Sequence, residues 1–251
     1  MWLCDRCQDE GASGSLVGVI ARGPERGVAL FAALAILMLV SAIGLGLALT
    51  TSLEPTIASA HEASLSSAYV AEAGLAIALH ELRGIADWNL VLSGQTRSAI
   101  LQSGAGADWF LPDGTRADVR SLTNLANCGH AAVCTSAELD AFTTDRPWGP
   151  NNPRWQLFGY GRLDQLASTD PVLPPGGVII WVGDDPAELD ADPLHDTPFA
   201  TDGAPRSGAG VIVLRAEGFG IRGAHRVLTM TVSRAPAAGS PPVAGGWREI
   251  R

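Results

Sequence analysis

Six carboxylates lie close together in the stretch 184–196 of the sequence. Carboxylate oxygens at short, alternating spacing are ligands that Ca²⁺ accepts. The stretch lacks the turn glycine and the final bidentate Glu of an EF-hand loop, so a solvated acidic loop without metal is the simpler explanation. If calcium does bind, the sequence predicts Asp184, Asp190 and Asp192 as its ligands, and we expect no other cofactor.

The four cysteines fall into two pairs. Cys128 and Cys134 close a short loop, and in an oxidising compartment such a pair forms a disulfide. Two free thiols in a mobile loop are the alternative. Cys4 and Cys7 form a single CxxC pair, which lacks the further ligands of a zinc site.

Catalytic groupings are not evident in the sequence. Residues 218–223 read Gly-Phe-Gly-Ile-Arg-Gly, the glycine spacing of a dinucleotide-binding turn. Such a turn must open a helix, whereas the residues that follow alternate as a strand does, so we predict a hairpin turn. The five histidines are scattered, and neither His61-Glu62 nor His80-Glu81 has the second His of a zinc-protease helix. We therefore predict a protein that is not an enzyme.

The composition narrows the choice of partners. The net charge of −9 argues against nucleic acid, because phosphate binding requires a basic surface. The 29 Gly and 16 Pro indicate many turns, as expected of β structure.

One stretch organises the chain, the apolar run from Val28 to Leu49. No charged residue lies between Arg26 and Glu54, and a helix over the run would be about 33 Å long, enough to cross a bilayer. Arg22 and Arg26 precede the run, and the next Arg after it is Arg83. The positive-inside rule therefore places the N-terminus in the cytoplasm and the rest of the chain outside.

The helical pattern continues beyond the membrane, because the segment 61–82 is rich in alanine. Six residues of this segment repeat at steps of three and four and therefore share one stripe of the helix: Leu65, Ala68, Glu72, Leu75, Leu79 and Leu82. We thus expect a leader at 1–27 and one helix at 28–86, with a transmembrane part at 28–49 and a stalk at 50–86.

Residues 87–234 are expected to form an α+β head with a small antiparallel sheet. Alternating and apolar runs predict strands at 154–163, 177–182, 210–217 and 225–233, a short strand at 117–122 and a short helix at 93–103. The tail, 235–251, is rich in Pro, Gly and Ala, and we predict that it is flexible.

The junction Arg26-Gly27 before the apolar run resembles the class III leader of type IV pilins and pseudopilins. The stalk segment 69–75, the residues Asp87-Trp88-Asn89 and the strand pair 214–232 resemble the PilX-like minor pilins. The resemblance implies that a prepilin peptidase cuts between Gly27 and Val28 and methylates the new amino group of Val28. It also implies that the apolar helix packs against the helices of other pilin or pseudopilin subunits.

The sequence departs from the major pilins at one position. Major pilins carry a Glu five residues after the cut, and this chain has Ala32 there. In the family that Glu pairs with the amino terminus of a neighbouring subunit, so its absence indicates a minor subunit.

The expected function is therefore that of a non-enzymatic minor pilin-like subunit in type IV pilus assembly, priming, or tip and adhesion function. The expected location is the bacterial inner membrane, with a single span and the C-terminal head in the periplasm or on a cell-surface pilus. Two alternatives remain open: a minor pseudopilin of a type II secretion system, and an uncleaved single-pass periplasmic binding protein.

Overall fold

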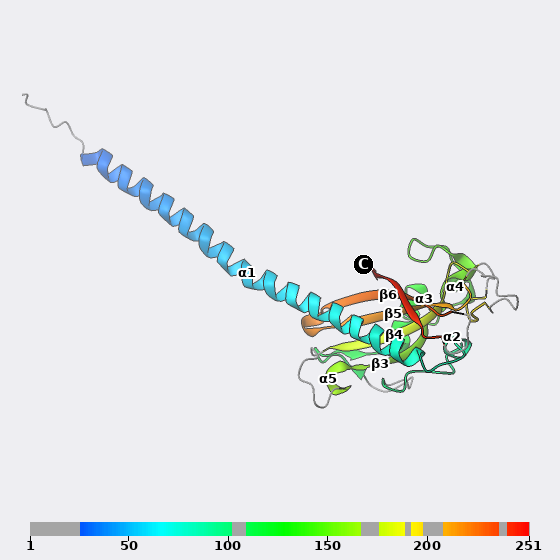
Figure 1. Ribbon diagram of the computed structural model, residues 1–251. Coiled ribbons are helices and arrows are strands. Elements are labelled where there is room, and N and C mark those ends of the chain that lie inside the picture. Colours follow the sequence, from blue (N-terminus) through cyan, green and yellow to red (C-terminus); the bar gives the residue numbers. More distant parts are fainter. Residues whose placement is uncertain are drawn as a thin grey trace, which may run out of the picture. The chain divides into compact units, whose positions relative to one another are not determined.

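The computed structural model describes residues 26–101, 109–166, 176–188, 192–197, 208–235 and 240–250. The chain divides into two compact units, 1–55 and 56–251. The helix α1, Arg26–Leu82, includes Pro55, where the division falls (Figure 1). The predicted leader, 1–27, lies almost wholly outside the described residues.

The first unit contains the apolar part of α1. Every described side chain from Gly27 to Ala58 is exposed. Leucine, alanine and isoleucine lie on all sides of this segment, so its apolar surface is not limited to one stripe. A helix that is apolar all round requires a cover of lipid or of other helices.

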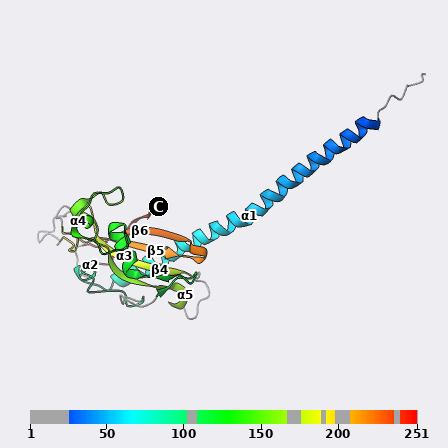
Figure 2. The same cartoon turned by 180° about the vertical axis from the view of Figure 1, so that it is seen from behind.

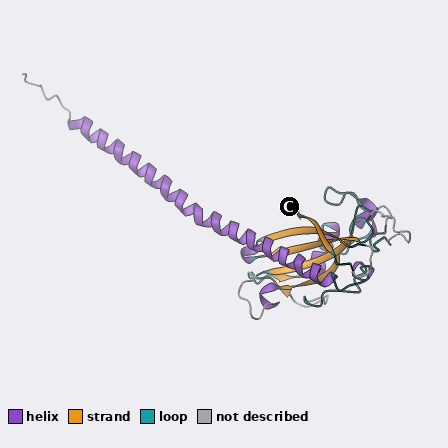
Figure 3. Ribbon diagram, viewed as in Figure 1, coloured by secondary structure: helices purple, strands orange, loops and turns teal. Residues whose placement is uncertain are grey.

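The second unit is built on an antiparallel sheet of five strands in the order β3-β4-β5-β6-β7 (Figure 3). The strands are β3 (Gln156–Arg162), β4 (Gly177–Asp184), β5 (Val211–Phe219), β6 (His225–Ser233) and β7 (Val243–Ile250). Each strand pairs with the next along the chain, and β1 (Trp109–Phe110) and β2 (Arg116–Ala117) form a separate small pair. The structure is therefore α+β, with a long N-terminal helix followed by an antiparallel sheet.

Residues 56–82 of α1 pack on one face of this sheet. The buried residues of this core are small or apolar on the helix and mostly β-branched or leucine on the strands: Val70, Ala71, Leu75, Ala78 and Leu82 with Val178, Ile180, Ile212, Leu214 and Val232. The helix lies very close to β5, because a Cβ added to Gly218 would come within 2.1 Å of the Ser67 carbonyl oxygen. Arg226 of β6 also donates to the Ser64 hydroxyl, at 3.0 Å.

The buried side of α1 coincides with the stripe seen in the sequence only in part. Leu75 and Leu82 are buried, but Leu65 is 44% exposed and Glu72 is exposed. Ala63, Ser67 and Ala71 face the sheet instead. At Ser67 and Ala71 the helix lies too close to Gly218 of β5 for larger side chains, whereas Val70, Leu75 and Leu82 are buried in the core.

A second core lies on the other face of the sheet, under the helix α3, Val119–Cys128 (Figure 2). Trp109, Trp155, Tyr160, Ile179 and Trp181 are buried there. The Trp181 indole Nε1 donates to the Thr123 hydroxyl at 2.9 Å, which fixes α3 on β4.

The short strand predicted at 117–122 is wrong, because most of that segment begins α3. Asp118 caps the helix by accepting from the Arg120 backbone N–H at 3.0 Å. Val119 and Ala126 then lie on one side of the helix and are buried, at the spacing of two turns.

The short helix predicted at 93–103 is also wrong in its described part. Residues 93–101 form turns and bends, and a one-turn helix, α2, precedes them at Asn89–Leu92. The carboxylate of Glu81 holds this segment, because it accepts from the Ser98 hydroxyl at 2.5 Å and from the Ala99 N–H at 2.6 Å. The other short helices are α4 (Ser136–Leu139) and α5 (Leu163–Leu166), with 3₁₀ turns η1 (Gly149–Asn151) and η2 (Ile221–Gly223).

The prediction that the tail, 235–251, is flexible is wrong for Val243–Ile250, which form β7. Val243–Ile250 pair with β6 in the registers Ser233↔Val243 and Val227↔Ile250. The pairing supplies hydrogen-bond partners to the backbone groups of β6, which the Gly- and Pro-rich composition did not indicate. Residues 236–239 and Arg251 lie outside the described residues.

The close approach of α1 to β5 gives a testable prediction. We expect Gly218→Ala to lower the free energy of unfolding by about 2–3 kcal/mol, because the new methyl group meets the helix backbone. Gly246→Ala is the matched control, since a Cβ there meets nothing within 4 Å. Thermal unfolding of both variants of the full chain in detergent measures the difference, and equal Tm values would contradict the prediction.

Candidate functional site

The predicted processing junction lies at the described start of α1. Gly27 and Val28 belong to its first turn, and the Val28 side chain is 71% exposed. A Cβ placed on Gly27 would meet nothing within 4 Å. Both positions of the predicted junction are therefore exposed among the described residues.

The segment after the junction provides one large apolar surface. Phe31 is 79% exposed and Met38 is 75% exposed, and no residue from Gly27 to Leu53 has a titratable side chain. Within the described residues, α1 is the one helix long and apolar enough to cross a membrane. Ala32 lies on this surface and is exposed.

The loop after α3 is closed by a disulfide between Cys128 and Cys134, the pair expected from the sequence, with Cα atoms 5.9 Å apart. The loop is also held by Asn124, whose side-chain amide donates to the Ala131 carbonyl at 3.0 Å. The covalent and polar contacts together join the end of α3 to the start of α4.

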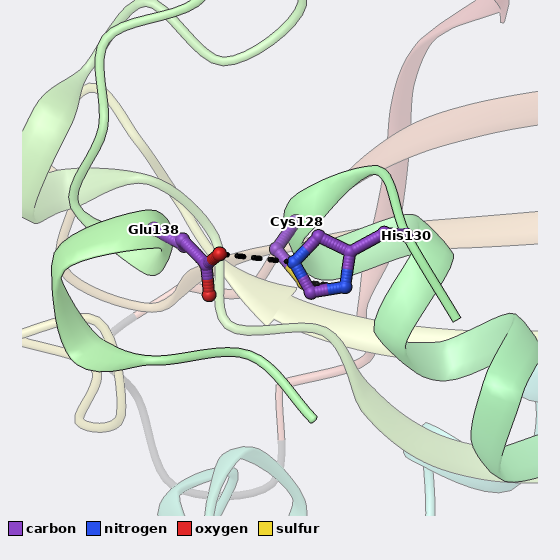
Figure 4. A group of neighbouring side chains, drawn as sticks. All are labelled: Cys128, His130 and Glu138. Carbon is purple, nitrogen blue, oxygen red and sulfur yellow. Dashed lines mark hydrogen bonds and ion pairs between the residues drawn. The ribbon is translucent and has the colours of Figure 1, made fainter. Parts of the chain in front are cut away.

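A second set of contacts orders the same loop. Thr135 caps α4, and Glu138 accepts from the Thr135 N–H at 2.7 Å and from its hydroxyl at 2.8 Å. The hydrogen bonds from Thr135, with a further one from His130, lower the pKa of Glu138 to about 2. Figure 4 shows Glu138 and His130 facing one another, with His130 Nε2 3.1 Å from Glu138 Oε1.

Cys128, His130 and Glu138 form the one group of metal-ligand type that converges among the described residues, with ligand atoms within 4.8 Å of one another. The Cys128 sulfur is bonded to Cys134, so it is not available as a thiolate ligand. Glu138 is already used in the cap of α4. The chemistry of the group therefore fits a stabilised loop better than a metal centre.

Two of the carboxylates predicted to bind calcium, Asp184 and Asp192, are not part of this group. Asp184 ends β4 and is 3% exposed, whereas Asp192 is exposed and pairs with His195 at 3.0 Å. Asp190 lies outside the described residues. Two other acids of the same stretch have structural partners: Glu188 accepts from the Thr197 hydroxyl at 2.9 Å, and Asp196 from the Gly210 N–H at 2.6 Å. Calcium binding stays a prediction.

One buried carboxylate lies on the sheet face opposite α1. Glu217 of β5 is 5% exposed, and it accepts from Arg215 at 2.6 Å and from His225 Nε2 at 3.0 Å. Burial raises the pKa of Glu217, but the hydrogen bonds from His225 and Arg215 and the Arg215 charge outweigh it, so the pKa lies below 4.5. The guanidinium of Arg215 also lies 5.9 Å from the ring centroids of both Trp155 and Trp181.

Sequence reasoning missed two of these groups, although signals for them exist. Thr135 and Glu138 have the spacing of a capping box, which is readable from the sequence. Arg215 and Glu217 occupy alternate positions of a predicted strand and therefore share a face. That this face is buried was not predictable, because α3 covers it from a distant part of the chain.

Searches against protein families, curated proteins and solved structures find no match to this chain. The chain is an α+β protein whose N-terminal helix is long and apolar enough for one membrane span.

The disulfide gives a second prediction. We expect reduction to lower the free energy of unfolding by about 2 kcal/mol, because the cross-link closes a loop with a sequence separation of 6. Thermal unfolding with and without dithiothreitol measures the effect. The double variant Cys128→Ser/Cys134→Ser is the control: its Tm should match that of the reduced protein and should not respond to the reductant. A Tm of the parent chain that is insensitive to reduction would contradict the prediction.

The Arg215–Glu217–His225 network gives a third prediction, on pH. The pKa of Glu217 is lower in the folded chain than its ordinary value of 4.5. The stability that the Glu217 carboxylate gives to the fold is therefore fully present above pH 4.5 and is lost as the pH falls through the folded pKa. Glu217→Gln should cost about 3 kcal/mol at pH 7, since it leaves Arg215 without its charged partner. It should also make the loss of stability below pH 4.5 less steep.

The check is urea unfolding of the parent and variant chains between neutral and acidic pH. Glu72→Gln, at an exposed position of α1, is the matched control and should leave the profile unchanged. Parallel profiles for the parent and Glu217→Gln would show that Glu217 does not contribute to the acid transition.

Proposed function

We propose that this chain is a non-enzymatic minor pilin-like subunit of a type IV pilus, acting in assembly, in priming, or at the tip. The observation that carries the proposal is α1. Residues 28–49 of α1 present an exposed apolar surface, and residues 56–82 of the same helix cover one face of an antiparallel sheet.

The apolar surface of α1 suits two environments in turn. Alanine and glycine are frequent along it, and Gly44 and Gly46 have open space around them. Small residues let helix backbones approach closely, so the segment can pack against the helices of other subunits as well as in lipid. A subunit that moves from a membrane into a filament requires this property.

The orientation of the proposed span follows from charge. Arg22 and Arg26 flank the apolar run on its N-terminal side, and Glu54 is the first charged residue after it. The positive-inside rule then favours a bacterial inner-membrane protein with its head in the periplasm. A disulfide in the head is consistent with that oxidising compartment.

Ala32 supports a minor role rather than a major one. A Glu at this position would be a charged acceptor for the amino group of a neighbouring subunit, and alanine offers no such contact. Subunits without it would depend on apolar packing for their place in a filament. Prepilin peptidase and other pilin or pseudopilin subunits are therefore the proposed partners.

The fourth prediction tests the junction. Co-expression with a prepilin peptidase should yield a mature chain that begins at Val28 and carries one added methyl group on its amino terminus. Mass spectrometry of the membrane-extracted protein measures both. Gly27→Ile should block cleavage because a bulky side chain replaces the small residue before the cut, whereas Gly23→Ile, within the leader, is the control and should be processed normally.

Each outcome separates the proposal from its rivals. An intact chain that retains residues 1–27 contradicts it and favours an uncleaved single-pass periplasmic binding protein. A cleaved chain that cross-links to secretion pseudopilins rather than to pilins favours the type II secretion alternative.

A further inference from the structure

A cavity of about 310 Å³ lies on the face of the sheet opposite residues 56–82 of α1. Its floor is formed by alternate residues of β5, β6 and β7, and its wall by the segments 145–155 and 185–186. The volume is at the lower end of the range of small-molecule sites, about 300–1,000 Å³. The cavity therefore has room for a ligand of the size of one sugar ring.

Two guanidinium groups lie in one row across the floor. Arg215 is the cross-strand partner of Thr229, and Thr229 is the partner of Arg248. Cross-strand neighbours have side chains on the same face, so both arginines flank the Thr229 hydroxyl. Arg215 is paired with Glu217, whereas exposed Arg248 has no ion pair among the described residues.

A third guanidinium belongs to the wall. Arg146 donates to the carbonyl oxygens of Leu139 and Pro153, at 3.2 and 3.1 Å, and its Nε is buried without a hydrogen-bond partner. Burial, followed by the nearby charges of Arg154 and Arg215, lowers the pKa of Arg146 to about 10. Because the charge of Arg215 is balanced by Glu217, Arg146 and Arg248 are the two cavity guanidinium groups to which a bound anion could add an ion pair.

The cavity also contains groups that a simple anion would not use. The indoles of Trp148, 37% exposed, and Trp155, 7% exposed, offer apolar surface. Asp145 and Asp185 line the same space and would repel an anion that had no hydroxyl groups to donate to them. A neutral sugar, conversely, would bring no carboxylate to Arg146 and Arg248.

We propose that this cavity binds an acidic sugar, a ring that carries both a carboxylate and hydroxyl groups. The carboxylate is bound by Arg248 with Arg146, the hydroxyl groups donate to Asp145 and Asp185, and the apolar face of the ring lies against Trp148. Each of the three kinds of side chain then has a complementary group on one ligand. The site belongs to the head alone and does not depend on how α1 is covered.

The fifth prediction tests this site with the full chain in detergent. Isothermal titration with sodium D-glucuronate should give saturable binding with a Kd of about 1 mM or tighter. D-Glucose lacks the carboxylate, and sodium acetate lacks the ring and its hydroxyl groups. Both should bind at least about tenfold more weakly than glucuronate. Arg248→Gln should weaken glucuronate binding about tenfold, and Trp148→Ala should do the same through loss of the ring contact.

Arg120→Gln is the matched control, because Arg120 is exposed on α3 outside the cavity. It should bind glucuronate as the parent chain does. Equal binding of glucose and glucuronate, or of acetate and glucuronate, would overturn the proposal. So would the absence of saturable binding up to about 20 mM glucuronate, or unchanged affinity in a folded Arg248→Gln variant.

Discussion

The close contact between residues 56–82 of α1 and strand β5 is the constraint on which the head depends. Ser67 and Ala71 lie so near Gly218 that no Cβ fits there. This distance selects small residues on the helix and brings α1 within reach of Val178 and Ile180 of β4. With one face of the sheet sealed in this way, the alternate residues of β5 and β6 are left for α3, for the Glu217 network and for the cavity.

Much of the fold was predictable because its signals are local. The lack of charge before Glu54 predicted the long helix, and the alternation of β5 and β6 predicted their hairpin. The buried side of α1 was predictable only in part from its leucines, because Leu75 and Leu82 are buried but Leu65 is exposed and Ala63, Ser67 and Ala71 face the sheet. The segment 117–122 was misread as a strand, since its capping residue, Asp118, is a stronger signal than the one β-branched residue, Val119. Strand β7 escaped prediction because a Gly-rich segment gains its order from β6.

The candidate site likewise has features that were predictable from the sequence and one that was not. The Cys128–Cys134 pair was predictable because a short loop brings the two residues together whatever the rest of the chain does. The Gly27–Val28 junction is likewise a local pattern of the sequence. The cavity, by contrast, joins Arg146, Arg215 and Arg248 from three distant segments. Such a group forms only after the sheet order is set, so no spacing in the sequence points to it.

The absence of titratable side chains from Gly27 to Leu53 has a consequence for movement across a lipid phase. A membrane potential does work on a segment only in proportion to the charge that the segment carries, about 2.3 kcal/mol per charge for every 100 mV. The side chains of this segment carry none. In a chain cut as we propose, the new amino group of Val28 is then the charge at this end of the helix on which a membrane potential could act, because the side chains from Val28 to Leu53 add none.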